Sequence, residues 1–131
     1  MRKMILIAVV AAASVCMAQD DEAPLRNAMK QIGPTNGALG KKIGAKDASA
    51  SAEAEKLQAL FVDVRKFWEG RSTADAVEFA KNANEQFGQV AKLISAGQWE
   101  DAAASQKKAG ANCMGCHSAH REKAEGGWKI K

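Results

Sequence analysis

Two cysteines and a histidine stand close together near the C-terminal end, in the run Cys113-Met114-Gly115-Cys116-His117. Thiols at this spacing can add across the two vinyl groups of one haem, and the adjacent imidazole then lies beneath the iron. The run therefore predicts one covalently attached haem c per chain. Cys113 and Cys116 are expected to form the thioethers, and His117 is expected to be the proximal iron ligand.

The same residues have three other uses that stay open. A redox dithiol of the thioredoxin kind needs a strand before a helix, and no strand is evident in the sequence. A disulfide between Cys113 and Cys116 would join one helical turn and constrain almost nothing. Zinc could take both thiolates with His117 and His120, but four ligands within eight residues of one helix cannot easily surround a metal tetrahedrally. We favour haem, because c-type haem is attached outside the bacterial cytoplasm and the chain begins like an exported protein.

The first 18 residues are predicted to be a cleaved signal peptide. A basic start, Arg2-Lys3, precedes an apolar run from 4 to 13 that is too short for a permanent membrane anchor. Small residues then place the cleavage site after Ala18. A lipoprotein cysteine at Cys16 is the alternative, although the valine before it is a poor match to that signal. Export predicts a periplasmic protein.

The mature chain, residues 19–131, is expected to form a single domain. It keeps two of the three cysteines, so it has no long-range disulfide framework. It carries 17 Lys and Arg against 15 Asp and Glu, a net charge of +2 that two haem propionates would cancel. This balance gives no indication of nucleic-acid binding.

The elements that must position the haem are predicted to be helices, because the chain is rich in Ala, Lys, Glu and Gln. Apolar residues recur every three or four positions in four segments, at about 20–43, 48–69, 72–97 and 99–124. Their short connections predict an all-α fold, an antiparallel four-helix bundle with the haem attached near the C-terminus. Several core positions are alanines, so the haem-free chain is expected to be molten or unfolded.

Local signals refine these segments. Pro34 is expected to kink the first helix without dividing it, because the apolar stripe keeps its phase across the proline. Gly70 and Gly97 are expected to stop the second and third helices. Ser72 is expected to open the third with a capping box that Asp75 completes. Residues 126–131 are expected to form a loose tail.

The stretch from Gly110 to Arg121 resembles the C-terminal signature of the class II c-type cytochromes, the cytochrome c-prime family. The resemblance continues in segments of all four predicted helices, at 29–33, 37–40, 67–69 and 97–100. It implies a four-helix bundle with the haem near the C-terminus. The chain departs from the family at His120, where an aromatic residue is usual. The family's arginine near the distal site would fall at Leu25, one place before Arg26.

The resemblance also suggests which residue could be the sixth ligand of the iron. In high-spin family members an apolar residue of the first helix blocks it, and in low-spin members a methionine of that helix fills it. Met29 stands at the matching position, so the resemblance implies that Met29 is the distal ligand. The alternative is that Met29 only packs in the core. Met114, between the two cysteines, cannot reach across the ring.

Other polar residues near the motif have weaker assignments. Arg121 matches a basic family residue and is expected to contact a propionate or the proximal side, with a solvated helix-end cation as the alternative. His120 is expected at the surface or facing a propionate. Lysines of the C-terminal region are candidates for steering an acidic redox partner; they are Lys107, Lys108, Lys123, Lys129 and Lys131.

These features predict a non-enzymatic periplasmic carrier of single electrons with His/Met-ligated iron. Its partners would be periplasmic redox proteins, which the sequence does not identify, and a homodimer is a further expectation from the family. The alternative is a high-spin, five-coordinate cytochrome that binds nitric oxide or carbon monoxide. A helical bundle stabilised by zinc or a disulfide, without haem, is the third hypothesis.

Overall fold

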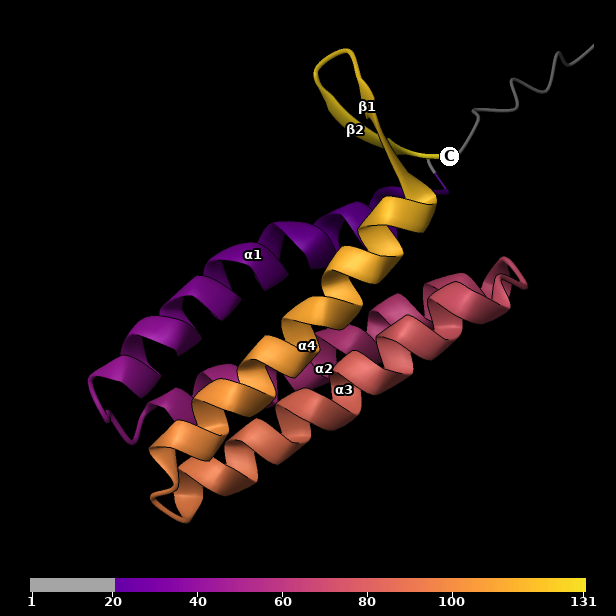
Figure 1. Ribbon diagram of the computed structural model, residues 1–131. Coiled ribbons are helices and arrows are strands. Elements are labelled where there is room, and N and C mark those ends of the chain that lie inside the picture. The colour runs from indigo at the N-terminus through magenta and orange to yellow at the C-terminus, as the bar shows by residue number, and fades with distance from the viewer. Residues whose placement is uncertain (1–20) are drawn as a thin grey trace, which may run out of the picture.

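The computed structural model describes residues 21–131, so the predicted signal peptide lies outside the described residues. Four helices of similar length pack against one another and alternate in direction along the chain (Figure 1). They are α1 (Ala23–Gly44), α2 (Ala50–Gly70), α3 (Ala74–Ser95) and α4 (Trp99–His120). Two short strands follow, β1 (Arg121–Ala124) and β2 (Gly127–Ile130).

The buried faces of the helices confirm the predicted apolar stripes. On α2 every predicted inner residue is buried; these are Ala54, Leu57, Phe61, Val64 and Trp68. On α1, Ile32, Leu39 and Ile43 are buried, whereas Met29 is only partly covered. Asn36 interrupts this stripe because it has a polar partner: Gln106 Nε2 on α4 donates to its backbone and side-chain oxygens at 3.0 and 2.9 Å.

Local signals at the helix ends were partly right. Pro34 lies inside α1 and the helix continues through it, as predicted. Gly97 adopts a φ of 72° just after α3, a conformation that favours glycine. The capping box at Ser72 is wrong: Ser72 itself has a φ of 52°, and Thr73 is the N-cap residue with no side-chain capping bond. The Asp75 carboxylate instead accepts a hydrogen bond from the His120 side chain.

The C-terminal segment differs most from expectation. Helix α4 ends at His120 rather than near residue 124, and the predicted loose tail is a β-hairpin. Strands β1 and β2 pair antiparallel from Arg121 opposite Ile130 to Ala124 opposite Gly127. Gly126 and Gly127, at φ of 79° and 148°, make the tight turn that residues with side chains would resist. Ile130 then packs against the core, which anchors the hairpin on the helices.

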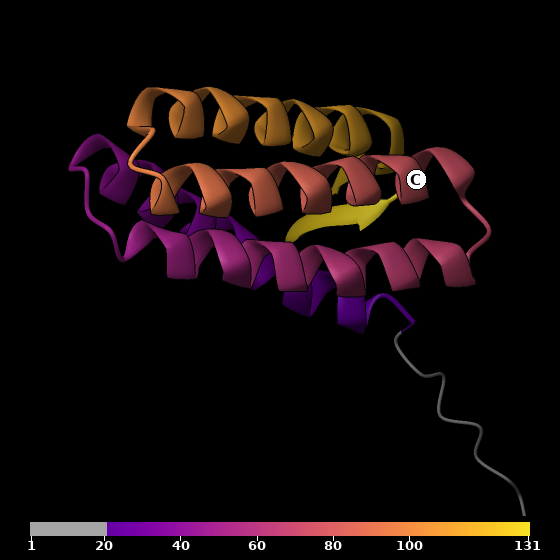
Figure 2. The ribbon, with the colours of Figure 1, turned by 90° about the horizontal axis from the view of Figure 1, so that it is seen from below.

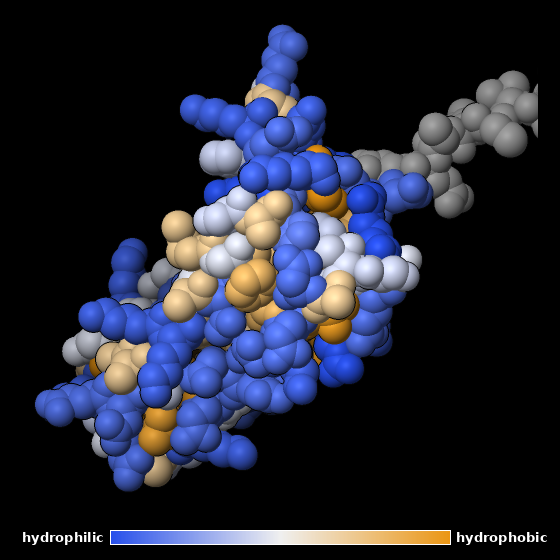
Figure 3. Space-filling model, turned by 45° about the vertical axis from the view of Figure 1, so that its right-hand side comes forward, coloured by the Kyte–Doolittle hydropathy of each residue, from blue (hydrophilic) through white to orange (hydrophobic). Residues whose placement is uncertain are grey.

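The extent of contact differs from one pair of helices to another. The pairs α2–α3 and α3–α4 have the most extensive contacts, whereas α1 and α4 touch far less. Seen from below in Figure 2, α4, α3 and α2 follow one another across the molecule, with part of the hairpin visible beyond them. The face in Figure 3 is mainly hydrophilic, with scattered apolar patches, the most extensive of them near the middle of the molecule. The loose contact between α1 and α4 leaves room for a cavity.

Candidate functional site

A cavity of about 610 Å³ lies at the hairpin end of the molecule, between α1 and α4. Its volume falls within the range of pockets that hold drug-sized molecules and cofactors, about 300–1,000 Å³. Apolar side chains from all four helices and the hairpin make most of its wall. They include Leu25, Met29, Ile32, Phe61, Val64, Trp68, Phe79, Ala80, Trp128 and Ile130.

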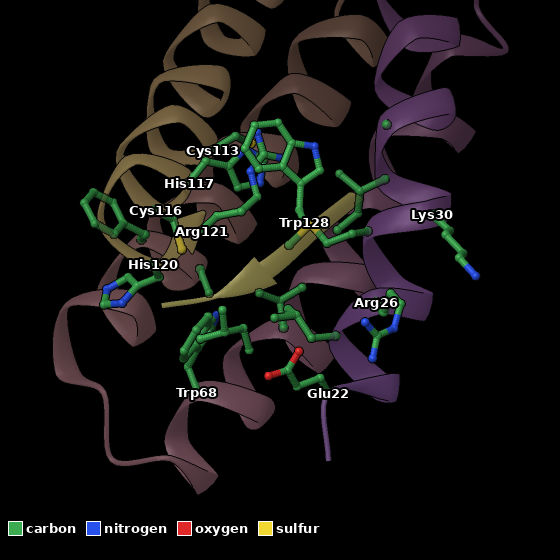
Figure 4. Close-up of a pocket in the computed structure, with 18 of the residues that line it drawn as sticks. Glu22, Arg26, Lys30, Trp68, Cys113, Cys116, His117, His120, Arg121 and Trp128 are labelled. Atoms are coloured by element: carbon green, nitrogen blue, oxygen red, sulfur yellow. The ribbon is translucent and has the colours of Figure 1, made fainter. Parts of the chain in front are cut away.

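The cavity brings together the site residues that the sequence predicted. Cys113, Cys116 and His117 line it from α4, and Met29 lines it from α1, some eighty residues away in sequence. Arg121, the first residue of β1, also lines the cavity, next to the end of α4 (Figure 4). Met114, by contrast, is 66% exposed and does not line the cavity. The turn of helix that carries the motif therefore presents both thiols and the imidazole to one enclosed space.

The ionisation of these groups follows from their burial. Cys113 and Cys116 are free thiols. Burial raises the pKa of the Cys113 thiol, and burial with the negative charges of Asp75 and Cys113 raises the pKa of Cys116 to about 11. Burial, helped by the Arg121 cation, lowers the pKa of His117, so its imidazole is neutral near pH 7 with a lone pair for an electrophile.

These properties bear on the rival uses of the motif. A redox dithiol needs a depressed thiol pKa, and the environment here does the opposite. The strands of the structure follow the motif helix as a hairpin, whereas the thioredoxin arrangement places a strand before it. Within residues 21–131 no group of three or more His, Cys, Asp or Glu side chains is arranged to hold a metal ion directly. The zinc hypothesis thus gains no support from the geometry.

The charged groups of the cavity suit an apolar molecule with an anionic edge. Among residues 21–131, four cations and one carboxylate, that of Glu22, line it. The cations are Arg26, Lys30, Arg121 and Lys129, of which Lys129 pairs with Glu122. Glu22 lies 3.9 Å from the Arg71 guanidinium. The residues present therefore fit a haem: two thiols and a neutral imidazole on one wall, a thioether among the other lining groups, apolar surroundings and a positive balance for the propionates.

Several lining residues were not identified from the sequence. Trp68 on α2 was predicted only as core, yet it forms part of the cavity wall and contacts His120, with ring centroids 5.1 Å apart. His120 Nε2 lies 2.8 Å from Asp75 Oδ2, so His120 connects α4 to both α2 and α3. The Asp75 pKa is lowered chiefly by this bond. Nothing in the sequence indicates that His120 pairs with Asp75, which stands 45 positions earlier.

The hairpin was missed for a different reason. Its strands are short and polar, and the four residues of β1 read as a continuation of the helix. The Gly126-Gly127 pair was the available signal, because two glycines between short segments are typical of a hairpin turn. Trp128 contributes to the cavity from β2, and the Arg121 guanidinium lies 4.0 Å from the centre of its ring.

Comparison with known proteins gives no further guide to this site. No protein-family model matches the chain. No curated protein matches it, and neither does any solved structure. Among the described residues, no helix is both long enough and apolar enough to cross a membrane.

Proposed function

We propose that this chain is a periplasmic monohaem cytochrome of the class II, c-prime kind, which carries single electrons in a four-helix bundle. One observation carries the proposal: Cys113, Cys116 and His117 line the same apolar cavity as Met29. This is the set of groups needed to attach a haem and to fill both axial positions of its iron. Bound there, a haem supplies reversible one-electron chemistry between ferric and ferrous iron.

Each residue of the chain then has a defined part. The Cys113 and Cys116 thiols would hold the haem covalently, and the neutral His117 imidazole would be an iron ligand from α4. The thioether of Met29 on α1 would be the second ligand, and His/Met ligation raises a reduction potential. Leu25, Ile32 and Val64 would exclude water from the bound group, because they give the cavity an apolar wall. Arg121, whose cation helps to keep His117 neutral, offers a positive charge to a propionate.

The visible spectrum tests the axial ligands after expression with a haem-attachment system. Wild type is expected to show sharp, split ferrous bands and a ferric methionine–iron charge-transfer band. Met29→Ala removes the thioether and is expected to give a broad high-spin spectrum that responds to carbon monoxide. Met114→Ala is the matched control, because Met114 points away from the cavity and its loss leaves the iron untouched. A low-spin spectrum in Met29→Ala would overturn ligation by Met29.

A second candidate function is gas binding at a five-coordinate iron. It is favoured by the apolar surroundings of Met29, since Leu25 lies one turn before it and Ile32 almost one turn after it on the cavity wall. In that case Met29 only packs, and wild type binds carbon monoxide at once. The same wild-type spectrum therefore decides between the two functions.

Partners and location follow from the proposed function. Export by residues 1–18 would deliver the chain to the periplasm, where a redox partner would dock beside the cavity. Lys107, Lys108 and Lys123 are exposed on α4 and β1 near that side. Lys129 and Lys131 are already engaged, with Glu122 at 3.2 Å and with the Ser118 carbonyl at 2.9 Å. A homodimer is part of the proposal through the family resemblance alone.

A further inference from the structure

Trp68 carries a buried hydrogen-bond donor that has no acceptor in the protein. The side chain is 3% exposed and lies near the C-terminal end of α2. Among the side chains of residues 21–131, its indole Nε1 is the only buried nitrogen or oxygen without a hydrogen-bond partner. An unpaired buried donor costs about 1–3 kcal/mol, so nearly all such groups in folded proteins find an acceptor.

Trp68 lies on the wall of the cavity, so a molecule bound there could supply the acceptor. Figure 4 shows the Trp68 side chain reaching into the cavity from α2, with His120 and Glu22 on either side of it in that view. An indole can only donate, so any partner must present a lone pair. His120 cannot serve through its Nε2, which already bonds the Asp75 carboxylate.

A haem narrows the choice of acceptor. Its four pyrrole nitrogens are bound to iron, so its two propionate carboxylates are its strong hydrogen-bond acceptors. The propionates stand on the porphyrin edge opposite the vinyl groups that the cysteines hold. Trp68 contacts His120, which lies beyond His117 along α4, whereas the cysteines precede His117. The tryptophan thus lies beyond His117 on the side away from the cysteines, where the edge opposite the vinyl groups would stand.

We propose that the Trp68 indole N–H donates a hydrogen bond to a haem propionate and so fixes the ionised state of that carboxylate. The assignment rests on the proposed function, since it requires the haem. Cations on the cavity wall, among them Lys30 and Arg121, support an anionic group in this cavity. A charge-assisted bond of this kind favours the carboxylate over the carboxylic acid.

The reduction potential measured against pH tests the assignment in Trp68→Phe. Phenylalanine keeps an aromatic ring but has no N–H. The propionate pKa, measured from the dependence of the reduction potential on pH, is therefore expected to rise by about 1–2 units. Trp99→Phe is the matched control, because Trp99 begins α4 at the other end of the molecule and does not line the cavity. Equal profiles in wild type and both variants would overturn the assignment.

Haem content separates this test from the proposed function. A red wild type with covalent haem but an unchanged Trp68→Phe profile rejects the Trp68 bond alone. A wild type without haem, expressed beside a working attachment system, rejects the proposed function and the bond with it.

A measurement on the unmutated side chain covers the case in which Trp68→Phe does not fold. In ferrous protein with ¹⁵N-labelled indoles, the Nε1–H proton of Trp68 is expected to move downfield as the propionate ionises. The three indole signals are assigned with Trp99→Phe and Trp128→Phe, and Trp99 in wild type serves as the internal reference. A Trp68 signal that does not follow the propionate titration overturns the proposal.

Discussion

The two ends of the four-helix fold are built in different ways. The packed end, which holds the α1–α2 and α3–α4 connections, is filled by side chains that are 0–4% exposed. They include Leu39, Ile43, Leu57, Phe87, Val90 and Ile94. The cavity end, at the hairpin, has a hole of about 610 Å³ instead. On α4 the buried residues are Ala102, Ser105 and Ala109, and no residue of the motif turn is fully buried.

This contrast follows from the sizes of the buried side chains. Of the twenty buried hydrophobic residues in the described part of the chain, nine are alanines, which contribute little apolar area each. At the packed end the larger side chains compensate for them. At the cavity end the Trp68 N–H has no acceptor among residues 21–131, and the two half-buried thiols face the hole. The packed end is filled by side chains, whereas the cavity end encloses space that the proposed haem would fill.

The largest expected effect comes from removing the ligand altogether. A Cys113→Ala/Cys116→Ala chain cannot hold the proposed haem covalently, and the cavity of about 610 Å³ then stays unfilled. We expect thermal unfolding followed by circular dichroism to lose its sharp transition, with helical signal retained and near-ultraviolet signal lost. A cooperative transition like that of the red wild type would show that the packed end stabilises the whole fold alone.

Truncating one leucine at each end compares them directly. Leu57 is fully buried at the packed end, so Leu57→Ala is expected to lower the free energy of unfolding by about 2–5 kcal/mol. Leu25 is only partly buried on the cavity wall, so Leu25→Ala should cost less than half as much. Urea unfolding of the haem-containing proteins measures both. Equal losses would mean that the two ends are equally well packed.

Substitution of two glycines inside helices, Gly88 and Gly115, compares the packing of the two ends a second time. A Cβ at Gly88 would meet the Gln58 side-chain amide at 2.6 Å, the far end of a flexible chain. Gly88→Ala is therefore expected to gain about 0.5–1 kcal/mol in unfolding free energy from helix propensity. A Cβ at Gly115 would meet the Phe79 ring at 2.6 and 2.9 Å, and Phe79 lines the cavity.

Gly115→Ala is accordingly expected to lose about 1–3 kcal/mol, because the ring must shift. The haem absorption bands should shift as well, since the displaced ring lies on the cavity wall. Urea unfolding and the visible spectrum report the two effects separately. A stabilised Gly115→Ala with an unchanged spectrum would show that Phe79 moves freely.

The smallest expected effect concerns Asp75, whose pKa is lowered chiefly by the bond from His120. A carboxyl with a lowered folded pKa binds fewer protons in the folded state, so its stabilising effect is present above its ordinary pKa of 3.8. That effect is lost as the pH falls through the lowered value. Asp75→Asn should flatten the dependence of stability on pH below about 4. Asp63→Asn, on the exposed face of α2, is the control and should leave the slope as it is.

Much of the fold could be predicted because helical periodicity is a local property. The inner residues of α2 were predicted correctly, and α1 continues through Pro34 as its stripe required. Asn36 broke the pattern, and its partner Gln106 lies 70 positions away, where periodicity carries no information. Ser72 failed as a cap because the chain turns there with a positive φ, and Asp75 bonds His120 instead.

The sequence by itself determined which reactive groups stand on one wall of the cavity. The spacing of Cys113, Cys116 and His117 is a property of consecutive turns of one helix, so it needs no knowledge of the rest of the chain. Only the tertiary structure decided what encloses them. The Trp68 indole, the Phe79 ring and the hairpin turn at Gly126 reach the cavity from elements far apart in sequence. Their approach depends on how the helices pack, because burial and charge balance at a point are sums over every element that meets there.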